Sequence, residues 1–148
     1  MKKLLFICLL MAATIPSQAQ ILHPVKWSYA AKKISANEAV VLLKATIEDG
    51  WHIYSVHQKE GGPMKTTITF DNQPNASYVG DIIEPNPIVK REEAFKMDVH
   101  FFNSSVIFQQ KIKLKTRETV IKGKVSFMVC NDNECLPPDE VTFSIPVR

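Results

Sequence analysis

The chain has few of the residues and runs that mark several common classes of protein. Its 148 residues include only three cysteines and five glycines. No apolar run reaches the roughly 20 residues that a membrane-spanning helix needs. The sequence has no glycine-rich phosphate loop and no serine elbow of the hydrolase type. Nucleotide binding, serine hydrolysis and a membrane-spanning fold are therefore unsupported.

The N-terminus has the pattern of a secretory signal. Lys2 and Lys3 precede an apolar run at residues 4–13, and Ser17-Gln18-Ala19 offers small residues for cleavage after Ala19. We predict that residues 1–19 are a signal peptide and that the mature chain is exported. Cys8 lies inside the apolar run and would leave with it, so only two cysteines remain.

The charge and size of the chain limit the possible partners and the number of domains. Residues 1–19 hold two of the 18 Lys and Arg and none of the 15 Asp and Glu, which leaves a net charge of +1. This near balance gives no argument for binding to nucleic acid or to an anionic membrane surface. The remaining length suits one domain with a real core, and no disulfide is needed for such a chain to fold.

Short apolar, β-branched segments broken by turn residues predict an all-β sandwich. Asp49-Gly50 is a turn signal that predicts a hairpin between the first two strands, and residues 34–37 have room for one helical turn. No repeat or linker divides residues 20–148. The expected strands lie at residues 38–48, 51–56, 66–70, 78–83, 98–102, 106–115, 119–129 and 141–147.

Alternation within two strands predicts which residues face the core. In residues 107–115 the apolar side chains share one parity and three lysines share the other, the pattern of a half-buried strand. In residues 119–130 the inward parity ends at Val129. Cys130 then falls on the outward parity, which predicts an accessible sulfur unless a bulge near Met128 shifts the register.

The two remaining cysteines, Cys130 and Cys135, permit two readings. As a structural clip, their disulfide would close a loop of about six residues, for which the chain-entropy model gives only about 2 kcal/mol. The protein would then be an exported immunoglobulin-like binding module. As a working pair, one sulfur would attack a partner while the other resolves the mixed disulfide. The nearby acids Asp132, Glu134, Asp139 and Glu140 disfavour a thiolate, which predicts a reducing couple.

Three segments resemble, in order, parts of the N-terminal periplasmic domain of the DsbD thiol:disulfide interchange protein. They are Asp49-Gly50-Trp51-His52-Ile53-Tyr54, Glu92-Glu93-Ala94-Phe95-Lys96-Met97, and residues 125–147 with the cysteine pair and Leu136-Pro137-Pro138-Asp139-Glu140. The likeness spans residues 21–148. It implies an immunoglobulin-like fold and a periplasmic protein-disulfide reductase that needs no cofactor.

The resemblance also implies a role for each site residue. Cys135 would form the mixed disulfide and Cys130 would resolve it. Phe95, on a cap loop with Glu92 and Glu93, would shield the pair. His52 and Tyr54 match two tyrosines near the family's site and would, with Glu93, shape the proton environment.

The family's partners are proteins. A thioredoxin-like domain donates the electrons, and periplasmic disulfide isomerases or cytochrome c maturation reductases accept them. We expect a monomer, at most peripheral to the membrane, that binds no nucleic acid. Two features depart from the family: the loop between the cysteines has four residues rather than five, and the chain ends at Arg148. We therefore expect a stand-alone module.

The histidines and a paired carboxylate suggest no other chemistry. His23, His52, His57 and His100 match no common zinc spacing, so no metal site is predicted. Glu92 and Glu93 are adjacent and would point to opposite faces of a strand, which gives no support for acid-base hydrolysis.

Overall fold

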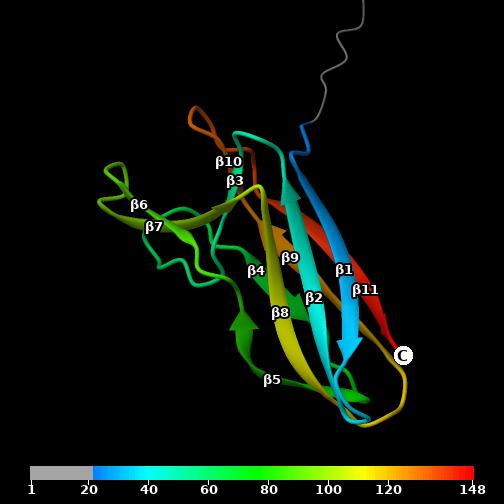
Figure 1. Cartoon of the computed structure of the whole chain (residues 1–148). Helices are drawn as coiled ribbons and strands as arrows, with labels where there is room; N and C mark the ends of the chain where they lie inside the picture. The colour runs from blue at the N-terminus through cyan, green and yellow to red at the C-terminus, as the bar shows by residue number, and fades with distance from the viewer. Residues whose placement is uncertain (1–21) are drawn as a thin grey trace, which may run out of the picture.

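The computed structural model describes residues 22–148, which form eleven strands and contain no helix (Figure 1). The predicted signal peptide lies outside the described residues, and within them no helix is long and apolar enough to cross a membrane. The strands are β1 (Val25–Lys33), β2 (Glu38–Ile47), β3 (His52–Tyr54), β4 (Thr67–Phe70), β5 (Ala76–Ile83), β6 (Ile88–Glu92), β7 (Met97–Asn103), β8 (Ser105–Leu114), β9 (Thr119–Phe127), β10 (Val129–Cys130) and β11 (Asp139–Val147).

The strands form three antiparallel sheets. The sheet β1-β2-β8-β5 packs against the sheet β11-β9-β4, and the third sheet, β10-β3-β7-β6, extends one end of this sandwich (Figure 1). Strand β7 runs into β8, and β9 runs into β10, with one residue between the strands in each case. The predicted all-β sandwich is confirmed.

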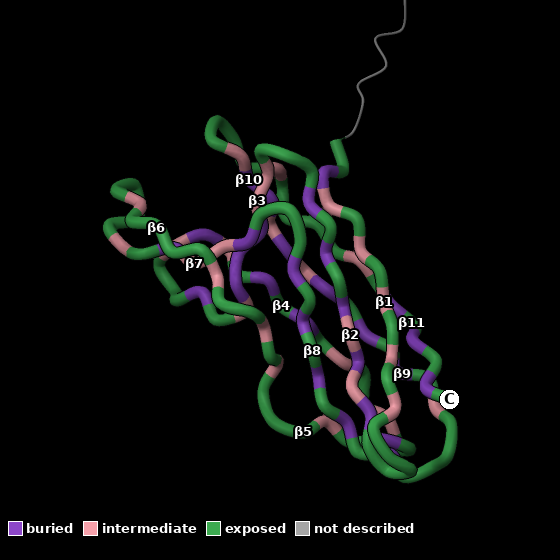
Figure 2. Tube along the Cα trace, in the orientation of Figure 1, coloured by how far each residue is buried: buried purple, intermediate pink, exposed green. Residues whose placement is uncertain are grey.

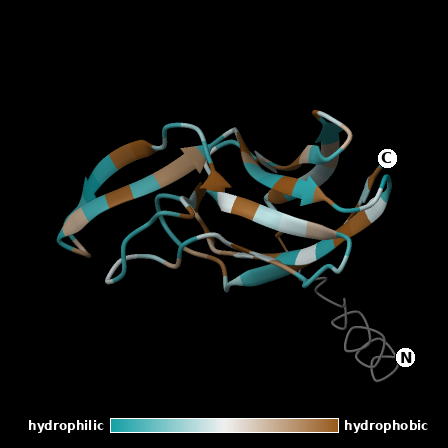
Figure 3. Ribbon diagram, turned by 90° about the horizontal axis from the view of Figure 1, so that it is seen from below, coloured by the Kyte–Doolittle hydropathy of each residue, from teal (hydrophilic) through white to brown (hydrophobic). Residues whose placement is uncertain are grey.

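Strict alternation builds the core between the two main sheets. In β8 every second residue is buried, as its sequence predicts, and Phe108 is 0% exposed. The inward residues of β9, from Ile121 to Phe127, are buried in the same way. Buried and more exposed residues alternate along the strands of the sandwich (Figure 2), as do apolar and polar residues (Figure 3). Burial of each large apolar side chain contributes roughly 1.5–3 kcal/mol.

The predicted hairpin at Asp49-Gly50 is wrong. A tight turn does form, with a hydrogen bond from Trp51 N to Glu48 O and a positive φ at Gly50. However, β2 already pairs with β1 and β8 on its two edges, so β3 cannot add to it and joins the third sheet between β7 and β10. Residues 34–37 form the bend between β1 and β2, without a helical turn.

Two strands were not predicted from the sequence. Strand β1 alternates, but its inward residues are only half-buried, because it lies at the edge of its sheet. Strand β6 is exposed along most of its length and has no period. It pairs only with β7 to form a hairpin, here called the arm (residues 88–103), which projects to the left of the sandwich in Figure 1.

Candidate functional site

The two cysteines form a disulfide across the neck of a tight hairpin after β10. Asn131 N donates to Glu134 O and Leu136 N donates to Val129 O, both at 2.9 Å. Cys130 and Cys135 thus face each other as a pair without mutual backbone hydrogen bonds, the closer of the two antiparallel pairings. Their Cα atoms are 4.0 Å apart.

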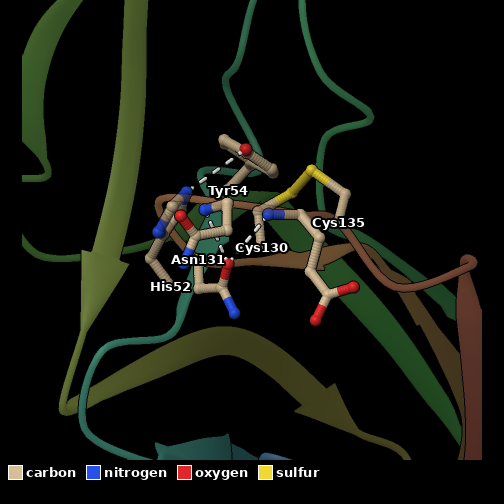
Figure 4. The surroundings of a disulfide bond; sticks show 7 residues. His52, Tyr54, Cys130, Asn131 and Cys135 are labelled. Carbon is tan, nitrogen blue, oxygen red and sulfur yellow. Dashed lines mark hydrogen bonds between the residues drawn. A yellow bond between two sulfur atoms is a disulfide. The ribbon is translucent and has the colours of Figure 1, made fainter.

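Asn131 fixes the loop between the cysteines. Its side-chain Oδ1 accepts hydrogen bonds from the backbone N of Asn133 and of Glu134, each at 2.8 Å (Figure 4). Asparagine is suited to this position because its short side chain can mimic a backbone acceptor two residues on. The loop geometry is therefore set by local hydrogen bonds as well as by the sulfur–sulfur bond.

The two cysteines differ sharply in exposure. Cys130 is 2% exposed, whereas Cys135 is exposed. Cys130 does point away from the main core, because Val129 belongs to that core and Cys130 belongs to a separate cluster with Tyr54 and Val99. The predicted parity is therefore correct, but the predicted accessibility of Cys130 is wrong. Tyr54 and Val99, on neighbouring strands of the same sheet, bury this residue.

A groove of about 390 Å³ runs beside the disulfide, over the outer face of the third sheet. It brings together residues from β3, the arm and the cysteine hairpin. Phe95, at the tip of the arm, lines it and is 43% exposed. The lining residues are Gly50, Trp51, His52, Tyr54, Lys90, Glu92, Phe95, Val99, Phe101, Asn103, Cys130, Asn131, Asp132 and Cys135.

His52 and Tyr54 lie next to each other beside the disulfide (Figure 4). Alternation puts both side chains of β3 on the groove face, and His52 Nε2 is 3.3 Å from the Tyr54 hydroxyl. The His52 ring also packs on Phe101, with ring centroids 4.9 Å apart. Both residues therefore lie in an aromatic wall of the groove, where they are partly shielded from solvent.

Burial shifts the pKa of both residues toward their neutral forms. Desolvation lowers the pKa of His52, against the opposing charge of Asp132. Desolvation raises the pKa of Tyr54, and the Glu92 charge adds to that rise. Near neutral pH the groove therefore holds a neutral imidazole and a protonated phenol.

Of the four acids close to the cysteines in sequence, one lines the groove. Asp132 lines the groove, whereas Glu140 bonds Ser126 and Lys124 on the sheet. Folding also brings in Lys90 and Glu92, whose side chains are 2.9 Å apart. The groove thus holds two carboxylates and one lysine.

Glu92 and Glu93 lie apart. Glu92 faces the groove, but the Glu93 side chain is 86% exposed, is 3.6 Å from Arg91 and does not line the groove. The turn is closed by hydrogen bonds from Phe95 N to Glu92 O and from Lys96 N to Glu93 O. The glutamate that charges the groove is thus Glu92.

Sequence reasoning missed Phe101, Lys90 and Asn103 as groove residues. Phe101 is adjacent to Phe102, and strand alternation sends Phe102 to the core and Phe101 to the groove. That signal was present in the sequence. Lys90 carried none, because only the pairing of β6 with β7 brings it to this face. Within residues 22–148, no three His, Cys, Asp or Glu side chains are placed to hold a metal ion.

Acidification is expected to destabilise the protein partly through His52. The unfolded residue, with a pKa near 6.5, takes up a proton before the buried one does. The stabilising contribution is therefore complete above about pH 6.5 and is lost as the pH falls toward the lower pKa of folded His52. Urea unfolding at pH 7.5 and 5.5 should show a smaller pH effect in His52→Gln than in wild type, with His23→Gln as an exposed control. An identical pH effect in His52→Gln and wild type would contradict this.

The comparisons with known proteins define the class. The family described as "Thiol:disulfide interchange protein DsbD, N-terminal" matches residues 18–146. The chain belongs to this family of thiol:disulfide interchange domains, and its sandwich is immunoglobulin-like. No curated protein matches it in sequence.

Solved structures share the fold. The N-terminal periplasmic domain of ScsB from Proteus mirabilis matches with a TM-score of 0.57 and 19% identity, over 90% of this chain and 48% of that one, so our chain spans about half of that structure. The reduced DsbD N-terminal domain of Neisseria meningitidis matches with a TM-score of 0.50 and 15% identity, over 91% and 90%. The same organism's complex of the DsbD and PilB N-terminal domains matches with a TM-score of 0.54 and 13% identity, over 89% and 86%.

Proposed function

We propose that the Cys130–Cys135 pair relays reducing equivalents from a thioredoxin-like donor to disulfides of exported proteins. The observation that carries this proposal is the difference in access between an exposed Cys135 and a buried Cys130, beside a groove. A partner sulfur reaches one of the two sulfurs and not the other, as an ordered exchange requires. A purely structural clip has no need of this asymmetry.

The exchange proceeds through a mixed disulfide. A donor thiolate attacks the Cys135 sulfur, the sulfur–sulfur bond breaks, and Cys130 leaves as a thiolate that takes up a proton. The donor's second thiolate then attacks its own sulfur in the mixed disulfide and releases Cys135. Two electrons and two protons have passed to the pair. In the second half, Cys135 attacks an acceptor disulfide, and Cys130 resolves the intermediate.

The groove residues assist in two ways. Phe95 shields the exposed Cys135 until a partner displaces the arm tip formed by residues 93–96. Tyr54 packs with Cys130, and its protonated phenol offers a proton, while the neutral His52 beside it accepts one. Glu92 sets the local charge, and the exposed Glu93 at the tip contacts a partner.

Both the setting and the partners are inferred from the relatives. The ScsB domain is described as periplasmic, which supports a periplasmic location and a signal peptide at residues 1–19. The Neisseria DsbD domain forms a complex with another protein domain, which supports a protein as the partner. The activity is then that of a protein-disulfide reductase, acting as a monomer and without a cofactor.

Mixing the oxidised protein with a reduced thioredoxin-like domain tests the proposal. We expect the Cys130–Cys135 disulfide to be reduced in native buffer while an equal amount of the domain is oxidised. Acid quenching, alkylation and mass spectrometry measure both changes. A small protein with a surface disulfide would serve as a generic acceptor in the second half, in which the reduced pair reduces that disulfide. Absence of any transfer in native buffer, with transfer restored by urea, would contradict the proposal.

A further inference from the structure

Two buried polar side chains lie in the turn that follows β3, outside the groove. Ser55 is 0% exposed and Gln58 is 4% exposed. A buried polar group without a partner is costly, so the hydrogen bonds of these residues indicate what the turn is built to hold. Those bonds lead to the two chain segments from which the arm begins.

Glu84 attaches the segment that leads into β6. Its carboxylate accepts hydrogen bonds from the Ser55 hydroxyl and from Val56 N, the latter at 3.0 Å. The Ser55 hydroxyl oxygen in turn accepts from His57 N at 2.8 Å. Only residues 85–87 separate Glu84 from the first residue of the arm.

The same turn attaches the second strand of the arm. Ser55 N donates to His100 O at 2.9 Å, and His100 N donates to Gln58 Oε1 at 2.7 Å. The backbone of Gly62 also lies against Met97, the first residue of β7 beside the arm tip, where an added Cβ would be 2.9 Å from the Met97 sulfur. The chain that follows β3 therefore holds β7 at His100 and Met97, and it holds the segment just before β6 through Glu84.

We propose that Ser55, Gln58 and Glu84, here called the clamp, position the arm so that Phe95 lies over the disulfide. A two-stranded hairpin is marginally stable alone, and β6 has a partner on only one edge. The direction of the arm thus depends on its base. The clamp residues are positioning residues that do not line the groove, and this inference rests on the shielding role proposed for Phe95.

The test is the rate at which dithiothreitol reduces the native disulfide. Gln58→Ala is expected to raise this rate roughly threefold to tenfold, the factor that corresponds to the loss of one net hydrogen bond. Gln110→Ala is the matched control: Gln110 is 3% exposed and donates to the carbonyls of Val79 and Gly80, with no bond to the arm. The reduction potential should stay unchanged in Gln58→Ala, because the clamp governs access and not the chemistry of the sulfurs.

A double-mutant cycle separates positioning from general loosening. In a Phe95→Ala background, where the shield is gone, Gln58→Ala should give no further acceleration. Equal rates in Gln58→Ala and Gln110→Ala would overturn the clamp, as would full additivity with Phe95→Ala. If Gln58→Ala does not fold, Glu84→Gln is measured in its place against the same thresholds. If Phe95→Ala raises the reduction rate and Gln58→Ala does not, the clamp is refuted and the shield is kept. If Phe95→Ala does not raise the rate, both are refuted.

Discussion

A Cys130→Ser variant is expected to stop the exchange at a covalent complex with its partner. Once Cys135 has attacked an acceptor disulfide, the mixed disulfide is resolved by the neighbouring thiol, and serine cannot do so. Non-reducing electrophoresis should show the complex as the main product, and peptide mapping should place its bond at Cys135. Cys135→Ser is the matched control, because its remaining cysteine, Cys130, is only 2% exposed. It should form roughly tenfold less complex, since access limits exchange.

The variant with both cysteines changed to serine separates a relay from a clip. The loop between them is also fixed by the two hydrogen bonds to Asn131 Oδ1. We therefore expect the double variant to stay folded and its free energy of unfolding to fall by about 2 kcal/mol, as the entropy of so short a loop implies. It should form no complex at all. Complex formation through Cys130 in place of Cys135, or collapse of the fold in the double variant, would contradict the roles assigned to the two sulfurs.

The strands with the clearest signal in the sequence are those with one buried face and one exposed face. In β8 and β9 one face meets the core and the other meets solvent, so period-two alternation is visible in the residues themselves. Strand β6 has no such contrast, because nearly all of it is exposed. The turn at Asp49-Gly50 was visible, but the sheet that its second strand joins depends on which edges of β2 are already occupied.

The sequence could not predict those features of the site that depend on contacts made by distant strands. The cysteine pair and Phe95 stand out in the sequence by residue type and neighbours. The burial of Cys130 does not, since Tyr54 and Val99 cover it from two other strands. The charge of the groove depends in the same way on Lys90 and Glu92, about 40 residues upstream of the cysteines and brought in by the arm.

The pair is also expected to be a reducing couple. Asp132 and Glu92 outnumber Lys90 in the groove, and negative neighbours disfavour a thiolate. The reduced form therefore lacks the stabilisation that makes DsbA an oxidant with a potential near −120 mV. We expect a potential at least about 100 mV lower, closer to that of thioredoxin at about −270 mV; a gap of 30 mV corresponds to about tenfold in the equilibrium constant. Asp132→Asn should raise the potential.

Redox titration of the wild-type protein in native buffer tests the central claim most directly. The protein is equilibrated with thiol–disulfide buffers of known potential at pH 7, quenched in acid, alkylated and analysed by mass spectrometry. A reversible disulfide that a partner can reach predicts complete equilibration without denaturant and a midpoint well below −120 mV, the value near which DsbA lies. A pair that changes state only after urea is added, or a midpoint at or above that of DsbA, would contradict it.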